Sequence, residues 1–149
     1  MGVQQLLLIV LAVIIVGTAI TIGIANLFKN STTMNRLSLS NEMLQFVIDT
    51  KVWDQAPQSI GGSDPSNRSK ESLIKWLAFT SQTEGFDMET ENGVYTVTFP
   101  NNNRVKFLGW GTEKGKKGKI KPGNRKRGYV RVKVVYNFRT DKTTTQTIN

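Results

Sequence analysis

The residues most able to do chemistry in this chain form a cationic run near the C-terminal end. Between Lys114 and Arg127, eight of fourteen residues are lysine or arginine. Such side chains attract phosphates and other anions through charge, with little dependence on sequence. The candidate anion- or partner-binding residues are therefore Lys114, Lys116, Lys117, Lys119, Lys121, Arg125, Lys126 and Arg127. A solvated basic loop and a protein–protein contact are the alternatives.

An acidic segment lies upstream of this run and contains Glu84, Asp87, Glu89 and Glu91. The chain as a whole carries a net charge of +9. Contacts between the acidic segment of one copy and the basic run of another would limit repulsion between copies. Two aromatic residues, Trp110 and Tyr129, flank the basic run and could stack on nucleic-acid bases. We expect both of them to lie in the core instead.

Composition argues against the common kinds of active site. The 149 residues include no histidine and no cysteine. This excludes disulfides and thiolate sites, and it removes the commonest general base and the commonest metal ligand. The sequence contains no glycine-rich phosphate loop and no nucleophile elbow. We therefore predict a non-enzymatic protein with no metal and no cofactor.

The N-terminal segment has no charged side chain from Met1 to Phe28, and the first charge is Lys29. A run of roughly 20 apolar residues is enough to cross a bilayer as a helix. A cleaved secretory signal would have a basic start and a shorter apolar stretch. We therefore expect a membrane anchor or the core of a helical assembly. Gly17 and Gly23 favour the assembly, because small residues allow helices to approach closely.

The opening Met-Gly-Val-Gln-Gln-Leu-Leu-Leu-Ile and the layout of the chain resemble type IV pilins and pseudopilins, including a group of short pilin-like bacterial proteins. The resemblance implies an apolar helix, an amphipathic continuation and a β-sheet head. One departure concerns the fifth position, where pilins usually carry a glutamate that pairs with a neighbour's terminal amine. Gln5, with Gln4 beside it, can hydrogen-bond to an ammonium group but cannot neutralise it.

The function implied by the resemblance is that of a structural subunit in an extracellular type IV pilus-like filament. The chain would assemble with itself as a helical homopolymer on the cell surface. Its precursor would reside in the inner membrane, and a pilus-type assembly machinery would incorporate it into the filament. The residues expected in the filament core are Gln4, Gln5, Leu6, Leu7, Leu8, Ile9, Val10, Leu11, Val13, Ile14, Ile15, Val16, Gly17, Ile20, Gly23, Ile24, Leu27 and Phe28. The alternative is a monomeric, membrane-anchored surface module that binds DNA or an anionic surface polymer through loop 111–127.

Residues 29–54 read as an amphipathic helix that ends near Trp53. Apolar residues recur at helical spacing at Met34, Leu37, Leu44 and Ile48, flanked by Met43 and Val47. We expect this stripe to pack on the sheet. A continuous helix of about 52 residues would be roughly 78 Å long. Two helices with a bend at 29–33 are the alternative.

Residues 55–149 are expected to form an α/β head. After a loop at 55–67, Asp64-Pro65 reads as the start of a short helix that runs to about residue 79 and places Leu73, Ile74, Trp76 and Leu77 toward the core. Alternation and turn residues predict strands at 86–90, 94–99, 104–110 and 129–139, with the basic loop at 111–127. The tail at 143–149 is a candidate edge strand. The fold class is therefore α+β, with a long N-terminal helix packed on an antiparallel sheet of about four strands.

Overall fold

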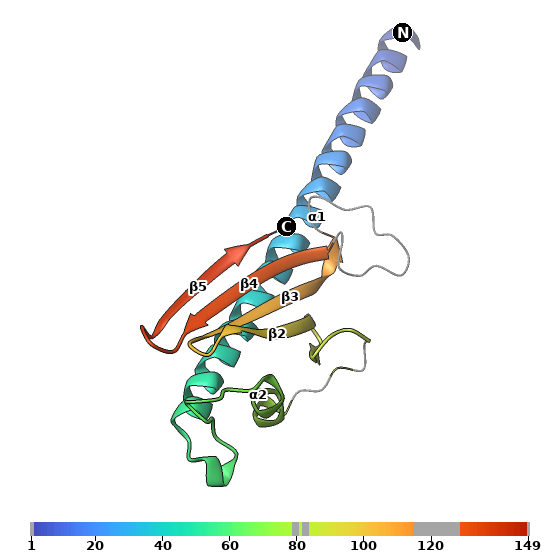
Figure 1. Ribbon diagram of the computed structural model, residues 1–149. Helices are drawn as coiled ribbons and strands as arrows, with labels where there is room; N and C mark the ends of the chain where they lie inside the picture. The colour runs from blue at the N-terminus through green and yellow to red at the C-terminus, as the bar shows by residue number, and fades with distance from the viewer. Residues whose placement is uncertain (1, 79–80, 82–83, 115–128, 149) are drawn as a thin grey trace.

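The computed structural model describes residues 2–78, 81, 84–114 and 129–148. In chain order, the elements are α1 (Gly2–Gln55), η1 (Gln58–Ile60), α2 (Lys70–Leu77), β1 (Met88–Thr90), β2 (Gly93–Asn101), β3 (Arg104–Lys114), β4 (Tyr129–Asn137) and β5 (Lys142–Thr147). The N-terminal half of α1 projects from the head, and its C-terminal half runs behind the sheet (Figure 1). The architecture is α+β, as the sequence predicts.

Helix α1 is continuous over 54 residues, or about 81 Å at 1.5 Å per residue. A bend at 29–33 is therefore wrong. Two polar side chains in this stretch bond within the helix: the hydroxyls of Thr32 and Thr33 donate to the carbonyls of Phe28 and Lys29 at 3.0 and 2.9 Å. Hydroxyl bonds of this kind often bend a helix, yet the backbone of α1 stays helical through this stretch.

The face of α1 that packs on the sheet is not the predicted one. The buried residues of the helix are Asn35, Leu39, Met43, Phe46, Val47, Thr50 and Trp53. The predicted stripe of Met34, Leu37, Leu44 and Ile48 is 40–65% exposed. Only the flanking residues Met43 and Val47 are buried as expected. The helix thus has two apolar stripes, and the sheet covers the one that contains the larger side chains Phe46 and Trp53.

The sheet has five strands in the order β1-β2-β3-β4-β5, and every neighbouring pair is antiparallel. The number exceeds the expected four because the tail adds an edge strand, β5, which confirms that candidate. The basic loop begins later than expected, since residues 111–114 belong to β3. A register shift between Trp110 and Lys114 lets β3 continue past the predicted strand end.

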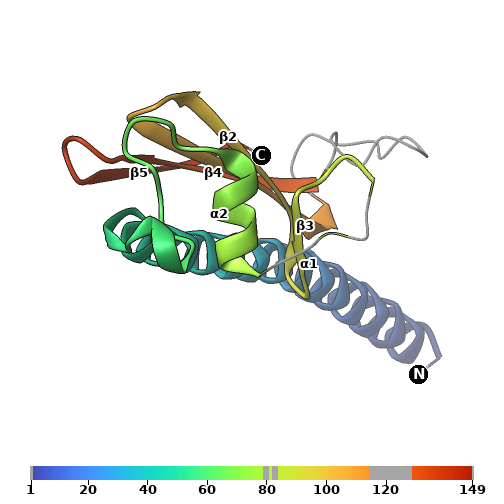
Figure 2. The same cartoon turned by 60° about the horizontal axis from the view of Figure 1, so that its bottom comes forward.

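The core lies between α1 and one face of the sheet, and α2 closes it beside β2 (Figure 2). The inward side chains of β4, including Val130, Val132 and Val134, are fully buried, while the alternating residues are partly exposed. This period of two is the one expected of a strand with a single buried face. On β4 the opposite face is therefore partly exposed to solvent, whereas Val94 and Trp110 are buried on the same side of the sheet.

Helix α2 starts later than predicted. Its N-cap is Ser69, whose hydroxyl accepts from the amide of Ser72 at 3.2 Å. Asp64 instead accepts from the amide of Ser66 at 2.9 Å and forms a local turn, which is a common alternative use of aspartate. In α2, Leu73 and Leu77 are buried, and Ile74 and Trp76 pack partly against the core.

Candidate interaction surfaces

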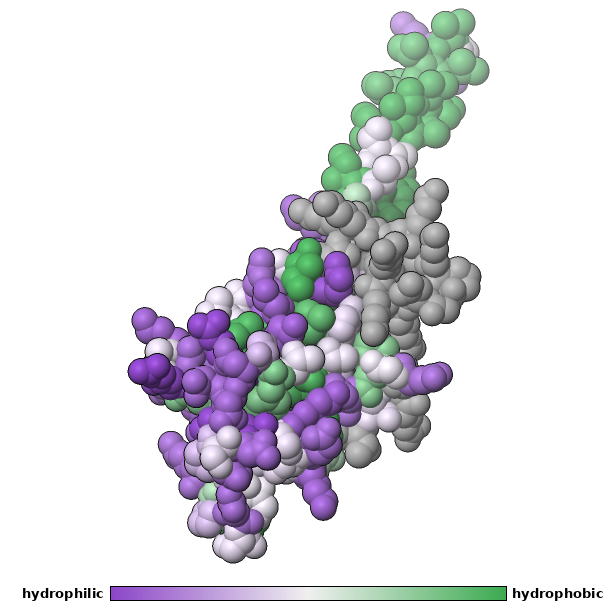
Figure 3. All heavy atoms as spheres, in the orientation of Figure 1, coloured by the Kyte–Doolittle hydropathy of each residue, from purple (hydrophilic) through white to green (hydrophobic). Residues whose placement is uncertain are grey.

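The predicted filament-core residues all lie on the projecting part of α1 and are exposed. The exposed fraction of the large apolar side chains there ranges from 49% at Val10 to 81% at Val3. Figure 3 shows this part of the helix covered almost entirely by hydrophobic residues. Among the described residues, α1 is the one helix long and apolar enough to cross a membrane, with a window of mean hydropathy 2.9 of which none is buried.

A second apolar surface continues along α1 beside the head. It comprises Met34, Leu37, Leu44, Ile48 and Val52, each between 40% and 65% exposed. We call these five residues the outer stripe. The outer stripe lies on the side of the helix that the sheet leaves uncovered. Aligned apolar side chains of this kind mark an interaction site more often than isolated ones do.

The first polar link between α1 and the sheet is made by Asn35. Its side-chain amide donates to the carbonyl of Asn92 at 3.3 Å, and its oxygen accepts from the amide of Glu113 at 3.3 Å. The glycine at 111 is required here, since a Cβ at that position would lie 1.9 Å from the Asn35 side-chain oxygen. The side chain therefore ties the start of β2 and the end of β3 to the helix.

Glu42 makes the second link, two turns further along. Its carboxylate accepts from Thr90 at 2.8 Å, from Asn92 at 2.6 Å and from the hydroxyl of Tyr95. Burial, followed by the hydrogen bond to Glu42, raises the pKa of Tyr95 well above its ordinary value. Every partner of Glu42 lies in β1, β2 or the turn between them, so this carboxylate fixes the sheet edge on the helix.

A nearly buried ion pair holds the C-terminal end of α1. The carboxylate of Asp54 accepts from Arg68 at 2.7 and 3.1 Å, and the hydroxyl of Ser63 donates to the same carboxylate at 2.8 Å. Only 9% of the Arg68 side chain is exposed. Its guanidinium also donates to the carbonyl of Asn102 and lies 4.3 Å from the ring centre of Phe138. The pair joins helix, loop and the β2–β3 turn.

A third charged link is more exposed. Lys51 pairs with Asp141 at 2.7 Å, and the hydroxyl of Tyr136 donates to the same carboxylate at 2.9 Å. The hydrogen bond from Lys51, followed by that from Tyr136, lowers the pKa of Asp141. Desolvation, followed by the hydrogen bond to Asp141, raises the pKa of Tyr136 to about 12.

Of the eight residues of the predicted basic site, the structure describes one. Lys114 is the last residue of β3. The other seven, Lys116, Lys117, Lys119, Lys121, Arg125, Lys126 and Arg127, lie outside the described residues. In the acidic segment, Asp87 serves the fold, because it pairs with Lys70 at 2.7 Å and accepts from the amide of Val97 at 2.8 Å.

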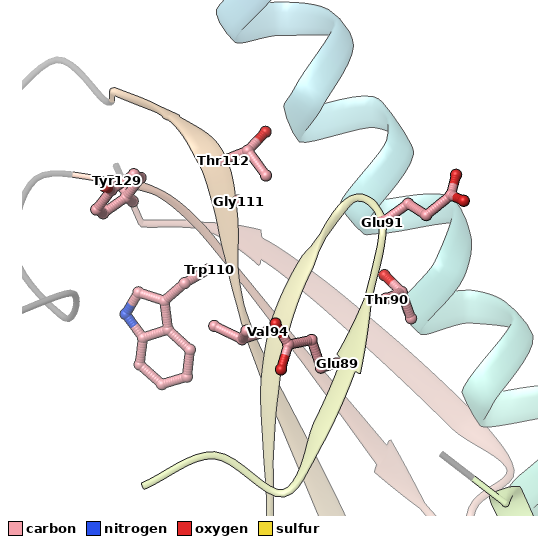
Figure 4. Close-up of a pocket in the computed structure, with 8 residues that line it drawn as sticks. All are labelled: Glu89, Thr90, Glu91, Val94, Trp110, Gly111, Thr112 and Tyr129. Atoms are coloured by element: carbon pink, nitrogen blue, oxygen red, sulfur yellow. The ribbon is translucent and has the colours of Figure 1, made fainter. Parts of the chain in front are cut away.

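A hollow of about 270 Å³ lies where β1, β2 and the ends of β3 and β4 meet. Its lining comprises Glu89, Thr90, Glu91, Val94, Trp110, Gly111, Thr112 and Tyr129 (Figure 4). Trp110 is 4% exposed and so is buried as expected, but it packs against Phe86 on the sheet face turned away from α1, outside the main core cluster. Tyr129, also expected in the core, is partly exposed. Among the described residues, no group of three or more histidine, cysteine or acidic side chains could hold a metal ion.

The open face of the sheet carries basic residues that the sequence reasoning did not single out. They are Arg104 and Lys106 on β3 and Arg131 and Lys133 on β4. The signal is present in the sequence of β4, where Arg131 and Lys133 alternate with valines. The four cations form one surface only because the sheet register places β3 beside β4.

Comparison with known proteins finds no match to a family model, to a curated sequence or to a solved structure.

Proposed function

We propose that this chain is a structural subunit of an extracellular, type IV pilus-like filament. The copies are held together mainly by the apolar N-terminal halves of α1. The observation that carries the proposal is the presence of two uncovered apolar surfaces on one continuous helix. The resemblance of the opening segment to pilins supports the same function.

The position of the outer stripe distinguishes a filament from a simple anchor. Residues 2–28 span about 40 Å as a helix, which already exceeds the hydrocarbon thickness of about 30 Å. If Phe28 lies at the bilayer boundary, Ile48 lies about 30 Å beyond it. In a monomeric anchor, apolar side chains at this distance from the bilayer would be exposed to water, and anchoring does not require them. A neighbouring helix would cover them.

The spacing of the outer stripe fits a helical neighbour. Met34, Leu37, Leu44 and Ile48 fall at the a and d positions of a heptad, with Asn41 at the intervening a position. Apolar residues in this pattern pack as knobs into the holes of a facing helix, and a polar residue at one a position helps to set register. The apolar helical segment of a second copy could therefore pack against the outer stripe.

The test compares three variants of the full chain. Ile14→Asp places a charge in the apolar segment, Ile48→Lys places one in the outer stripe, and Gln45→Lys adds the same charge at an exposed position outside the stripe. We expect electron microscopy of sheared material to show thin fibres of this chain for the wild type and Gln45→Lys. The other two variants should yield none.

Membrane fractionation and limited proteolysis of the head provide the controls. Ile48→Lys should remain inserted in the membrane with a folded head, because residue 48 contacts neither the lipid core nor the sheet. If wild-type material contains only detergent-soluble monomer, the anchored binding module replaces the filament. If Ile48→Lys forms normal fibres, the outer stripe is not a subunit contact.

A further inference from the structure

We propose that the open face of β3 and β4 binds the sugar–phosphate backbone of double-stranded DNA without sequence preference. The binding residues are Arg104, Lys106, Arg131 and Lys133, which we call the basic face. This site differs from the segment 114–127 and does not depend on filament assembly.

Strand register brings these four cations together. Lys106 lies opposite Val135, and Leu108 lies opposite Lys133. Lys106 and Lys133 are therefore diagonal neighbours, about 7–8 Å apart at their Cα atoms. Arg104 lies two residues before Lys106 on β3, and Arg131 lies two residues before Lys133 on β4. Because the two strands are antiparallel, these arginines extend the array at opposite ends. The four positive charges form a continuous band across the middle of the sheet.

Among the described residues, few counter-charges lie near the basic face. The outward residues on β2 and β5 are neutral or basic, including Thr96, Thr98 and Lys142. Glu89 lies on this side at the far edge, opposite Val94 in the register. Within the described part of the chain, none of the four cations pairs with a carboxylate, and the buried Nε of Arg131 has no hydrogen-bond partner. Figure 3 shows this side of the head as largely hydrophilic.

The surroundings favour a phosphate backbone over exposed bases. Proteins contact DNA backbones mainly with lysine, arginine and hydroxyl side chains. Lysine, arginine and threonine are frequent on this surface, with Leu108 and Val135 between the cations. Binding of single strands uses exposed aromatic rings as stacking platforms. The outward aromatic residue of β3, Trp110, is covered by the ring of Phe86 at a centroid distance of 5.2 Å and is only 4% exposed. Tyr129, which lines the same hollow, is only partly exposed.

A second copy of this chain is a weaker candidate for the same surface. Asp54, Asp87 and Asp141 are already engaged in ion pairs within the head. The exposed Glu71, Glu84 and Glu91 are spread over α2 and the loops on either side of β1. Duplex DNA, in contrast, presents one negative charge per about 1.7 Å of its axis. The polymer with the denser charge is therefore the better complement to an unpaired basic face.

The test measures binding of a fluorescently labelled 20-base-pair duplex of arbitrary sequence to the full chain in neutral detergent. Fluorescence anisotropy is recorded over a series of salt concentrations. The test variant is Lys106→Gln/Lys133→Gln. The matched control is Lys29→Gln/Lys75→Gln, which removes the same charge at exposed positions on α1 and α2.

Each phosphate contact contributes about 0.9 to the slope of log affinity against log salt. The test variant should therefore have a slope shallower by about 1.8. If the two lines meet at 1 M salt, affinity at 0.1 M falls by about 60-fold. The control should bind like the wild type, and intrinsic tryptophan fluorescence should confirm that both variants are folded.

Four outcomes would overturn the proposal. One is the absence of duplex binding by the wild type. A second is an unchanged salt slope in the test variant, which would assign DNA binding to other cations. A third is tighter binding of a single strand of equal charge, which would indicate base stacking. The last is concentration-dependent self-association without DNA binding, lost in the test variant, which would assign the face to a second copy.

Discussion

Replacing Leu39 and Leu37 separately with alanine tests which face of α1 packs on the sheet. The two leucines are two residues apart on one helix, and their substitutions delete the same atoms. Leu39 is fully buried, and Leu37 is 57% exposed. We expect Leu39→Ala to destabilise the head strongly and Leu37→Ala to leave its stability almost unchanged.

The magnitude follows from what surrounds Leu39. Its two methyl groups lie over glycines, so that a Cβ on Gly93 would be 2.9 Å from one and a Cβ on Gly111 would be 3.1 Å from the other. Glycine has no side chain that could move into the space left by alanine. The cost should therefore lie in the upper part of the usual range for buried leucine, at about 4 kcal/mol.

The assay is thermal and urea unfolding of the full chain in neutral detergent, followed by tryptophan fluorescence. A loss of about 4 kcal/mol corresponds to a fall in Tm of roughly 8–16 °C for a protein of this size. Leu37→Ala should change the free energy of unfolding by less than about 0.5 kcal/mol. Equal destabilisation by the two substitutions would refute the assignment of the buried face.

Three further predictions use the same unfolding assay. Gly111→Ala should destabilise the head by more than about 2 kcal/mol, because the new Cβ would lie 1.9 Å from the Asn35 side-chain oxygen; a loss below 0.5 kcal/mol would show that this contact adjusts freely. Arg68→Met should cost about 3 kcal/mol, because it leaves the largely buried Asp54 without its cation, and a neutral effect would contradict that. The raised pKa of Tyr136 means that the unfolded chain ionises first, so its stabilising contribution is complete below pH 10 and is lost between pH 10 and about 12. Tyr136→Phe should reduce this alkaline loss, and an unchanged pH profile would exclude Tyr136 as its source.

Features that depend on local pattern could be predicted well. The alternation in residues 129–139 identified a strand with one buried face, and β4, which ends two residues earlier, has that burial pattern. Turn residues between the strands predicted at 86–90 and 94–99 indicated a hairpin, and β1 and β2 pair there through Asn92 and Gly93. These predictions succeed because turn chemistry and a period of two act between neighbouring residues.

The buried stripe of α1 could not be predicted in the same way. The helix has two apolar stripes, and periodicity alone does not say which one meets the sheet. The buried stripe also contains two polar residues, Asn35 and Thr50, which lowers its apparent hydrophobicity. Asn35 is stabilised by hydrogen-bond partners 57 and 78 positions away in the sequence. Its burial therefore cannot be predicted from the residues near it in the chain.

The candidate sites divide in a similar manner. The uncharged segment 1–28 and the basic run 114–127 are visible as composition, and the sequence alone was enough to single them out. The basic face is formed by cations on two strands, which become neighbours only through the register of β3 with β4. A surface assembled across strands has no signature in either strand by itself.

The sequence by itself therefore determined the long apolar helix, the α+β class and the antiparallel strands, because hydrophobic runs, alternation and turn residues are local properties of the chain. Only the tertiary structure decided which side of the helix is covered and which cations share a surface. The reason is that both depend on contacts between residues far apart in sequence, where side-chain size, glycine backbones and polar partners select one packing among several compatible with the same pattern.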